Sequence, residues 1–160
     1  MMVFKILTLI GLALWVGALA LFIVVVAPIT FRSFPKEDAA RFMGMLFPAV
    51  DRWSLIWGGV TCGSMYLVFM GRHLAWRSLA LELPSALMLW GVFHCAFVLH
   101  PQIRELKRKL ALPEFRGTAH KQTIQFAFNN LHKRSGGLYL SILVVGLLLL
   151  GLFPRWFLRP

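Results

Sequence analysis

The chain has 160 residues, of which 59% are hydrophobic and 14% are charged, and its formal net charge is +11 at pH 7. A soluble domain carries about 25% charged residues, so this composition excludes an ordinary soluble domain and favours a protein that lies in lipid. Lys and Arg flank the apolar runs and no nucleic-acid module is recognisable. The basic charge therefore predicts contact with anionic lipid headgroups and no nucleic acid.

The longest apolar run predicts a first membrane span over residues 6–29. No charged residue lies between Lys5 and Arg32, and about 20 apolar residues suffice for a helix to cross the hydrocarbon core. A cleaved signal peptide has an apolar core of only about 7–15 residues, followed by a small-residue cleavage site. This run is longer and ends at Val24-Val25-Val26-Ala27-Pro28, so we expect a retained helix.

Three further apolar runs predict spans over residues 53–70, 79–99 and 138–153. The second contains Gly58, Gly59 and Gly63, which we expect to face another helix because small residues let helix backbones approach closely in a bilayer. The third is expected to end at His100-Pro101, since proline lacks the N–H that continues a helix.

Two polar connections, residues 30–52 and 100–137, separate these spans. The first carries Phe42, Met45, Leu46 and Val50 on one helical face, which predicts an amphipathic helix in the membrane interface. The second contains eight Lys and Arg residues. We therefore predict an all-α integral membrane protein in which residues 1–160 form a single membrane domain. Its architecture would be a four-transmembrane-helix bundle with an interfacial amphipathic helix between the first and second spans.

The distribution of Lys and Arg predicts the orientation of these spans. Four spans place five of the 17 basic residues on the side of both termini and twelve on the side of the two connections. Cytoplasmic loops carry the excess of Lys and Arg. We therefore expect both connections in the cytoplasm and both termini outside it, in a bacterial inner membrane.

Four side chains inside the spans are the candidates for a metal site: His94, Cys95, Cys62 and Met65. An ionisable residue at membrane depth is costly and suggests a function, and thiolate and thioether groups suit copper(I). Adjacent residues on a helix point about 100° apart, however, which weakens a joint site for His94 and Cys95. The ordinary structural roles, a small apolar cysteine and a histidine bonded to a neighbouring helix, stay open.

Haem is the other cofactor that the sequence allows, with His94 and either His132 or His100 as its ligands. No haem-attachment motif is present, and no cofactor is predicted. No catalytic motif surrounds any serine, cysteine or histidine, and no enzymatic activity is expected. The carboxylates are expected near helix ends or in loops: Glu37, Asp38, Asp51, Glu82, Glu105 and Glu114.

Short motifs between the spans carry a resemblance to a known family. They are Phe31-Arg32-Ser33-Phe34-Pro35, Leu46-Phe47-Pro48 and Phe128-Asn129-Asn130-Leu131-His132-Lys133-Arg134-Ser135. In this order and placement, the chain resembles the small four-span membrane proteins grouped as a bacterial domain of unknown function and related to the animal transmembrane-protein-205 family. More distantly, Trp15-Val16-Gly17 and Pro28 are similar to the copper-resistance D-type membrane proteins.

The resemblance implies a four-span fold but no chemistry. It marks these residues as positions of interest: Arg32, Pro35, Phe47, Pro48, Phe128, Asn129, His132 and Ser135. Asn129, His132 and Gly136 also recur at spacings of three and four, so they share one helix face. That face is the best candidate for a functional or interhelical site.

These observations favour a non-enzymatic multi-pass membrane protein that acts as a scaffold, an accessory factor or a partner subunit. Its partners would be the lipid bilayer and either another membrane protein or further copies of the chain. Two alternatives stay open. One is a small carrier or binder of metal ions or other solutes, and the other is a haem-binding membrane redox subunit.

Overall fold

The computed structural model describes residues 2–70, 76–112 and 118–157, and every regular element in these ranges is a helix. In chain order the elements are α1 (Met2–Ala20), η1 (Leu21–Val26), α2 (Ala27–Ser33), α3 (Lys36–Met70), α4 (Trp76–His94), η2 (Cys95–Leu99), α5 (His100–Ala111) and α6 (Thr118–Phe157). Four stretches are long and apolar enough to cross a membrane: Met2–Ser33, Glu37–Met70, Ala80–Ala111 and Lys121–Phe153. The prediction of a four-span membrane protein is confirmed at this level.

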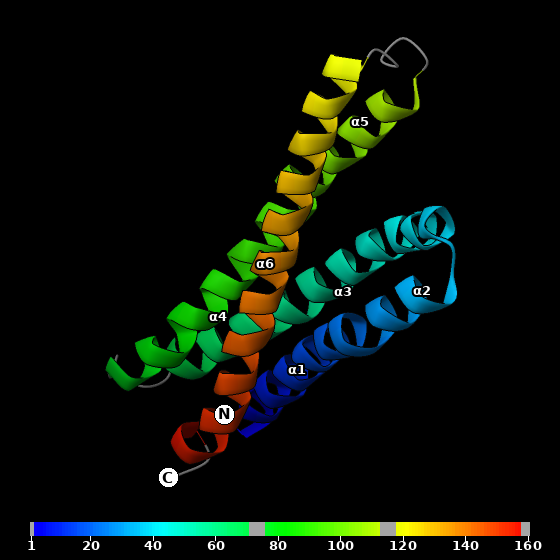
Figure 1. Cartoon of the computed structure of the whole chain (residues 1–160). Coiled ribbons are helices and arrows are strands. Elements are labelled where there is room, and N and C mark those ends of the chain that lie inside the picture. Colours follow the sequence, from blue (N-terminus) through cyan, green and yellow to red (C-terminus); the bar gives the residue numbers. More distant parts are fainter. Residues whose placement is uncertain (1, 71–75, 113–117, 158–160) are drawn as a thin grey trace.

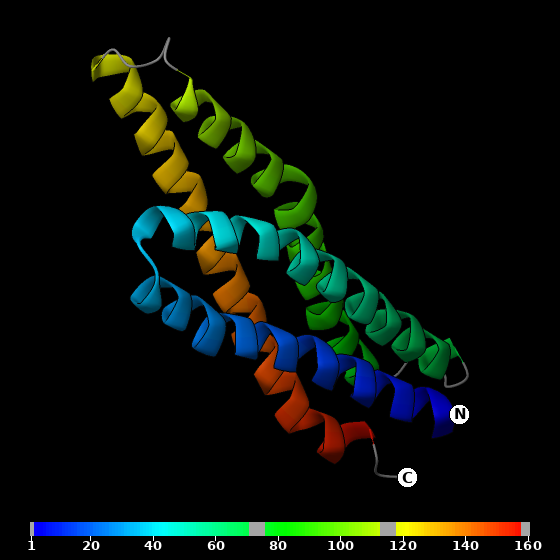
Figure 2. The same ribbon diagram turned by 90° about the vertical axis from the view of Figure 1, so that its right-hand side faces the viewer.

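The four rods form two antiparallel hairpins that pack against each other at an angle (Figure 1). The first hairpin is α1–η1–α2 with α3, and the second is α4–η2–α5 with α6. Both views show α5 and the beginning of α6 projecting beyond the turn between α2 and α3 (Figure 2). Large buried side chains fill the centre, among them Trp15, Leu19, Met65, Val92 and Phe153.

Two prolines are accommodated by π-helical turns. Pro28 and Pro101 are the second residues of α2 and α5, and each follows a π-helix, η1 or η2. A proline ring collides with the carbonyl four residues earlier, and a wider turn relieves this collision. The helix therefore continues through Pro101 to Ala111, although the sequence predicted that it would end at His100-Pro101.

The first half of α3 is also continuous with the second span, although a separate interfacial helix was predicted there. α3 runs for 35 residues through Pro48 without a break. Ala39, Met43, Phe47 and Asp51 recur every four residues on one side, and all are buried or half-buried. Because this stripe leads directly into the buried face of residues 53–70, one continuous helix buries more side-chain surface than two separate helices would.

Small residues bring the rods into close contact at particular points. A Cβ atom added to Gly58 would lie 2.8 Å from Leu89 Cδ1 and 3.0 Å from Trp15 Cη2. The same atom on Gly59 or Gly63 would meet nothing within 4 Å, and both residues are exposed. The prediction that these glycines face another helix therefore holds for Gly58 and is wrong for Gly59 and Gly63, because adjacent helical positions point to different sides.

The two neighbouring glycines provide a matched test of this packing. We expect Gly58→Leu to lower the free energy of unfolding in detergent by about 1–3 kcal/mol, the usual cost of overpacking a dense interior. Gly59→Leu should have almost no effect, because its side chain would extend toward lipid. Thermal unfolding of the two purified variants measures the difference. Equal melting temperatures for both variants would contradict the described packing of α3.

Candidate functional site

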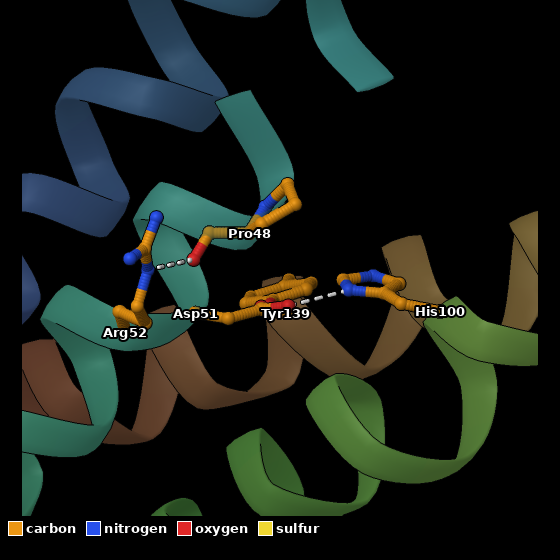
Figure 3. A network of polar contacts seen from close by, with 5 residues as sticks. All are labelled: Pro48, Asp51, Arg52, His100 and Tyr139. Atoms are coloured by element: carbon orange, nitrogen blue, oxygen red, sulfur yellow. Dashed lines mark hydrogen bonds and ion pairs between the residues drawn. The ribbon is translucent and has the colours of Figure 1, made fainter. Parts of the chain in front are cut away.

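Three buried polar side chains from three different helices meet near the middle of α3. They are Asp51 of α3, His100 at the start of α5 and Tyr139 of α6, which are only 5%, 5% and 2% exposed. His100 Nδ1 lies 2.6 Å from Asp51 Oδ2, and the Tyr139 hydroxyl donates a hydrogen bond to Asp51 Oδ1. Figure 3 shows these residues with Arg52, whose Nε donates to the carbonyl oxygen of Pro48 at 3.4 Å. We call Asp51, His100 and Tyr139 the polar triad.

Aromatic rings enclose the polar triad. The His100 and Tyr139 rings are stacked with their centroids 6.0 Å apart, and the Phe47 and His100 centroids lie 5.0 Å apart. In surroundings of low dielectric constant a hydrogen bond is electrostatically stronger than in water, and an unpaired polar group is costly. The rings therefore strengthen the contacts of the Asp51 carboxylate while shielding them from solvent.

The π-helical turn η2 places His100 in the bundle. The backbone N–H of His100 donates to the carbonyl oxygen of Cys95, five residues earlier. In an ordinary α-helix the fourth residue after Cys95 would lie above it on the same face. Here His100, the fifth residue after Cys95, takes that place above the fully buried Cys95. Both residues face the interior as a result. π-Helical turns inside α-helices frequently occur at functional sites.

The polar triad fixes the orientation of the imidazole and leaves one ring nitrogen available. Asp51 uses one carboxylate oxygen for His100 and the other for Tyr139. The second nitrogen of the imidazole, His100 Nε2, is buried and has no hydrogen-bond partner in the part of the chain that the structure describes. Because a buried polar atom is normally paired, this nitrogen is a candidate contact for a bound molecule.

An open pocket lies beside the polar triad, between α3, α5 and α6, with about 580 Å³ of empty space that includes its mouth. His100 forms part of its wall. Arg104, Lys107 and His132 supply its other polar side chains, and no acidic residue lines it within the described ranges. The remaining wall consists of small or apolar residues: Ala40, Met43, Gly44, Phe47, Pro48, Ile103 and Phe128. We call this space the basic pocket.

The structure brings four of the family-motif positions together at the basic pocket: Phe47, Pro48, Phe128 and His132. His132 is exposed at the pocket, and its ring stacks on Phe128 with the centroids 6.1 Å apart. The buried Ser135 hydroxyl donates to the carbonyl oxygen of His132 at 3.0 Å. Two motifs that are far apart in the sequence therefore form one site.

The other predicted positions lie elsewhere. Asn129 is exposed and accepts a hydrogen bond from Gln125 Nε2 at 3.2 Å. Gly136 is also exposed, so only His132 of the predicted polar face lines the pocket. Arg32 and Pro35 are exposed at the turn between α2 and α3, which stands apart from α6 in Figure 1.

The four candidate metal ligands occupy two kinds of surroundings. Cys95 and Met65 are buried in the hydrophobic core, at 0% and 1% exposure, and Cys62 is partly buried. His94 is half-buried, and its ring stacks on exposed Trp90 with the centroids 5.5 Å apart. Within the described residues, no three or more His, Cys, Asp or Glu side chains form a group that could hold a metal ion.

Sequence reasoning missed the polar triad. It expected Asp51 near a helix end or in a loop, which is wrong, and it expected the third helix to end at His100, whereas both helices continue past these residues. A signal was nevertheless present. Asp51, Ser54, Gly58 and Thr61 recur at spacings of three and four, which places small and polar residues on one face of an otherwise apolar helix. All four are buried.

These features define a multi-pass membrane protein with a buried polar triad beside an open basic pocket. Residues 10–111 match the model of a family described as a domain of unknown function (DUF4149), and the chain belongs to this family. The matched region contains Asp51 and His100 and ends before Tyr139. A search of curated proteins and a search of solved structures found no match. Kinship with transmembrane protein 205 and with copper-resistance D-type proteins stays a prediction.

The two tyrosines of the chain provide a test of the polar triad. Tyr139→Phe removes the hydroxyl that donates to the buried Asp51 carboxylate, and we expect a loss of about 1–3 kcal/mol of unfolding free energy. Tyr66→Phe makes the same chemical change at a residue that is 55% exposed, so it should leave stability unchanged. Unfolding in a denaturing detergent measures both variants. Parent-like stability of Tyr139→Phe would show that its hydroxyl does not support Asp51.

Proposed function

We propose that this chain is a non-enzymatic membrane protein that binds a small ligand in the basic pocket, with His100 as the polar contact at the pocket wall. One observation carries the proposal. Asp51 holds His100 Nδ1, whereas Nε2 of the same buried ring has no partner among the described residues. A buried polar atom without a protein partner is exceptional, and a bound molecule would supply the missing contact.

The residues that line the basic pocket support binding more than catalysis. Its described lining has basic and aromatic side chains but no serine, threonine, cysteine or carboxylate. The described lining therefore lacks the hydroxyl, thiol and carboxylate groups that many covalent mechanisms use as nucleophiles. Arg104 and Lys107 instead provide fixed positive charge at the pocket, and a few polar groups among apolar walls are typical of a ligand site.

Filling the pocket tests this function. Gly44 lines the basic pocket, and a Cβ atom there would come no closer than 3.8 Å to Lys107 Nζ. Gly44→Leu should therefore fold normally while occupying ligand space, and Gly59→Leu on the same helix serves as the control. After purification in mild detergent, we expect mass spectrometry to detect a stoichiometric small molecule with the parent and Gly59→Leu but not with Gly44→Leu.

Four results would contradict this proposal or replace it. Absence of any stoichiometric compound from the parent, or its retention by Gly44→Leu, would contradict binding in the pocket. Stoichiometric copper in the parent would favour the metal carrier, and a Soret absorption band would favour the haem-binding subunit.

A second candidate function is the role of an accessory or partner subunit that the sequence favoured. Its support is the exposed aromatic face of α4 and η2, where Trp90, Phe93 and Phe97 are 63%, 52% and 58% exposed. His94 lies on this face, where it is half-buried and its ring stacks on Trp90. A polar ring that faces lipid is costly, so a protein surface would be a better neighbour for it. A second protein that co-purifies in fixed ratio with the parent, and is lost on His94→Leu, would support this role.

We also propose that the basic pocket faces the cytoplasm of a bacterial cell and that both termini lie outside it. The support is the count of five against twelve basic residues on the two sides of the predicted spans. A reporter that is active only in the periplasm should give signal when fused at Pro160 and none when inserted near Pro113. Both positions lie outside the described residues. The opposite pattern would reverse the orientation.

A further inference from the structure

We propose that the basic pocket binds an anionic phospholipid, with the phosphate-bearing headgroup on its basic side and the acyl chains along its apolar wall. The inference rests on the proposed function and names the chemical class of its ligand. It follows from three features of the pocket: its unpaired cations, the buried His100 and its place in the membrane.

The cations of the pocket have no anionic partner within the described residues. The acidic side chain of α5, Glu105, lies 3.1 Å from Arg108 and 3.9 Å from Lys109. Neither of those residues lines the pocket, whereas Arg104 and Lys107 do. Lys107 Nζ makes only a 3.4 Å contact with the carbonyl oxygen of Ala40. One pair of cations on this helix thus shares the Glu105 carboxylate, whereas the other pair, Arg104 and Lys107, is available for an external anion.

His100 supplies an independent indication of a ligand. Its side chain is more than nine-tenths buried, it lines the basic pocket, and its Nε2 atom lacks a partner in the described structure. Because Nδ1 lies against the Asp51 carboxylate, Nε2 is the ring nitrogen left for a ligand. The side chains of Arg104 and Lys107 supply the charged donors, whose hydrogen bonds to phosphate oxygens are among the strong ones.

The position of the pocket favours a lipid over a soluble phosphate compound. Residues 53–70 of α3 contain no charged side chain, and at 1.5 Å per residue they span about 27 Å, close to the thickness of the hydrocarbon core. The α3 residues of the pocket, from Ala40 to Pro48, precede this stretch and therefore lie at headgroup level. Met43, Phe47 and Phe128 then offer apolar surface that an acyl chain covers and inorganic phosphate does not.

Two double variants of equal charge test the assignment. Arg104→Gln with Lys107→Gln removes both pocket cations, whereas Arg108→Gln with Lys109→Gln removes two neighbouring cations of the same helix. The full chain in detergent is titrated with phosphatidylglycerol or phosphatidylcholine, and binding is followed by native mass spectrometry. We expect the pocket variant to bind phosphatidylglycerol about tenfold more weakly than the parent, because strong hydrogen bonds to charged groups are lost.

The control variant should stay within about twofold of the parent, because its cations already contact Glu105 and are screened at the surface. Equal weakening of both variants would mean general attraction to the basic surface and would overturn the proposal. Equal binding of phosphatidylcholine by the parent, or displacement of the lipid by inorganic phosphate, would also overturn it. The two proposals can fail separately. If a compound co-purifies with the parent and not with Gly44→Leu, while the Arg104→Gln, Lys107→Gln variant binds phosphatidylglycerol normally, the proposed function stands and the lipid assignment fails. Matching melting temperatures for both double variants would establish that each is folded.

Discussion

The Asp51 carboxylate, with its two partners from other helices, is the interaction on which the rest of this structure depends. It connects α3 to His100 of α5 and to Tyr139 of α6 at one buried point. Between helices in lipid the hydrophobic effect supplies little attraction, so close packing and hydrogen bonds hold a bundle together. A buried carboxylate with both oxygens bonded is tolerated, whereas the same group left unpaired would be strongly destabilising.

The basic pocket is a consequence of the same junction. The π-helical turn before Pro101 allows the helix to continue into α5 and directs His100 inward. Asp51 then fixes the ring, and His100 lines a pocket whose cations come from the next turns of α5. The position of His100 and its contact with the buried Asp51 carboxylate thus depend on one local departure from α-helical geometry.

Much of the fold could be predicted from the sequence, because long uncharged runs such as residues 6–29 have few outcomes other than a membrane helix. The ends of the helices could not be predicted, since a polar or proline-containing helix that packs on a neighbour has the sequence pattern of a connecting segment. For this reason Asp51 and Pro101 were both expected at helix ends, although each lies within a continuous helix. The polar triad was missed for a related reason: Asp51 is separated from His100 by 49 positions and from Tyr139 by 88, and no local pattern records contacts between helices. His132 and Phe47 were found through short motifs, although the pocket that joins them was not.

The most direct test of this account is a double-mutant cycle between Asp51 and His100, measured as unfolding free energy in a denaturing detergent. Asp51→Leu and His100→Leu should each destabilise the protein, because each strands a buried polar partner. The double variant strands neither partner of this pair, so its loss should be smaller than the sum of the single losses by about 1–3 kcal/mol. Losses that simply add, within about 0.5 kcal/mol, would show that the two residues do not interact and would contradict the account.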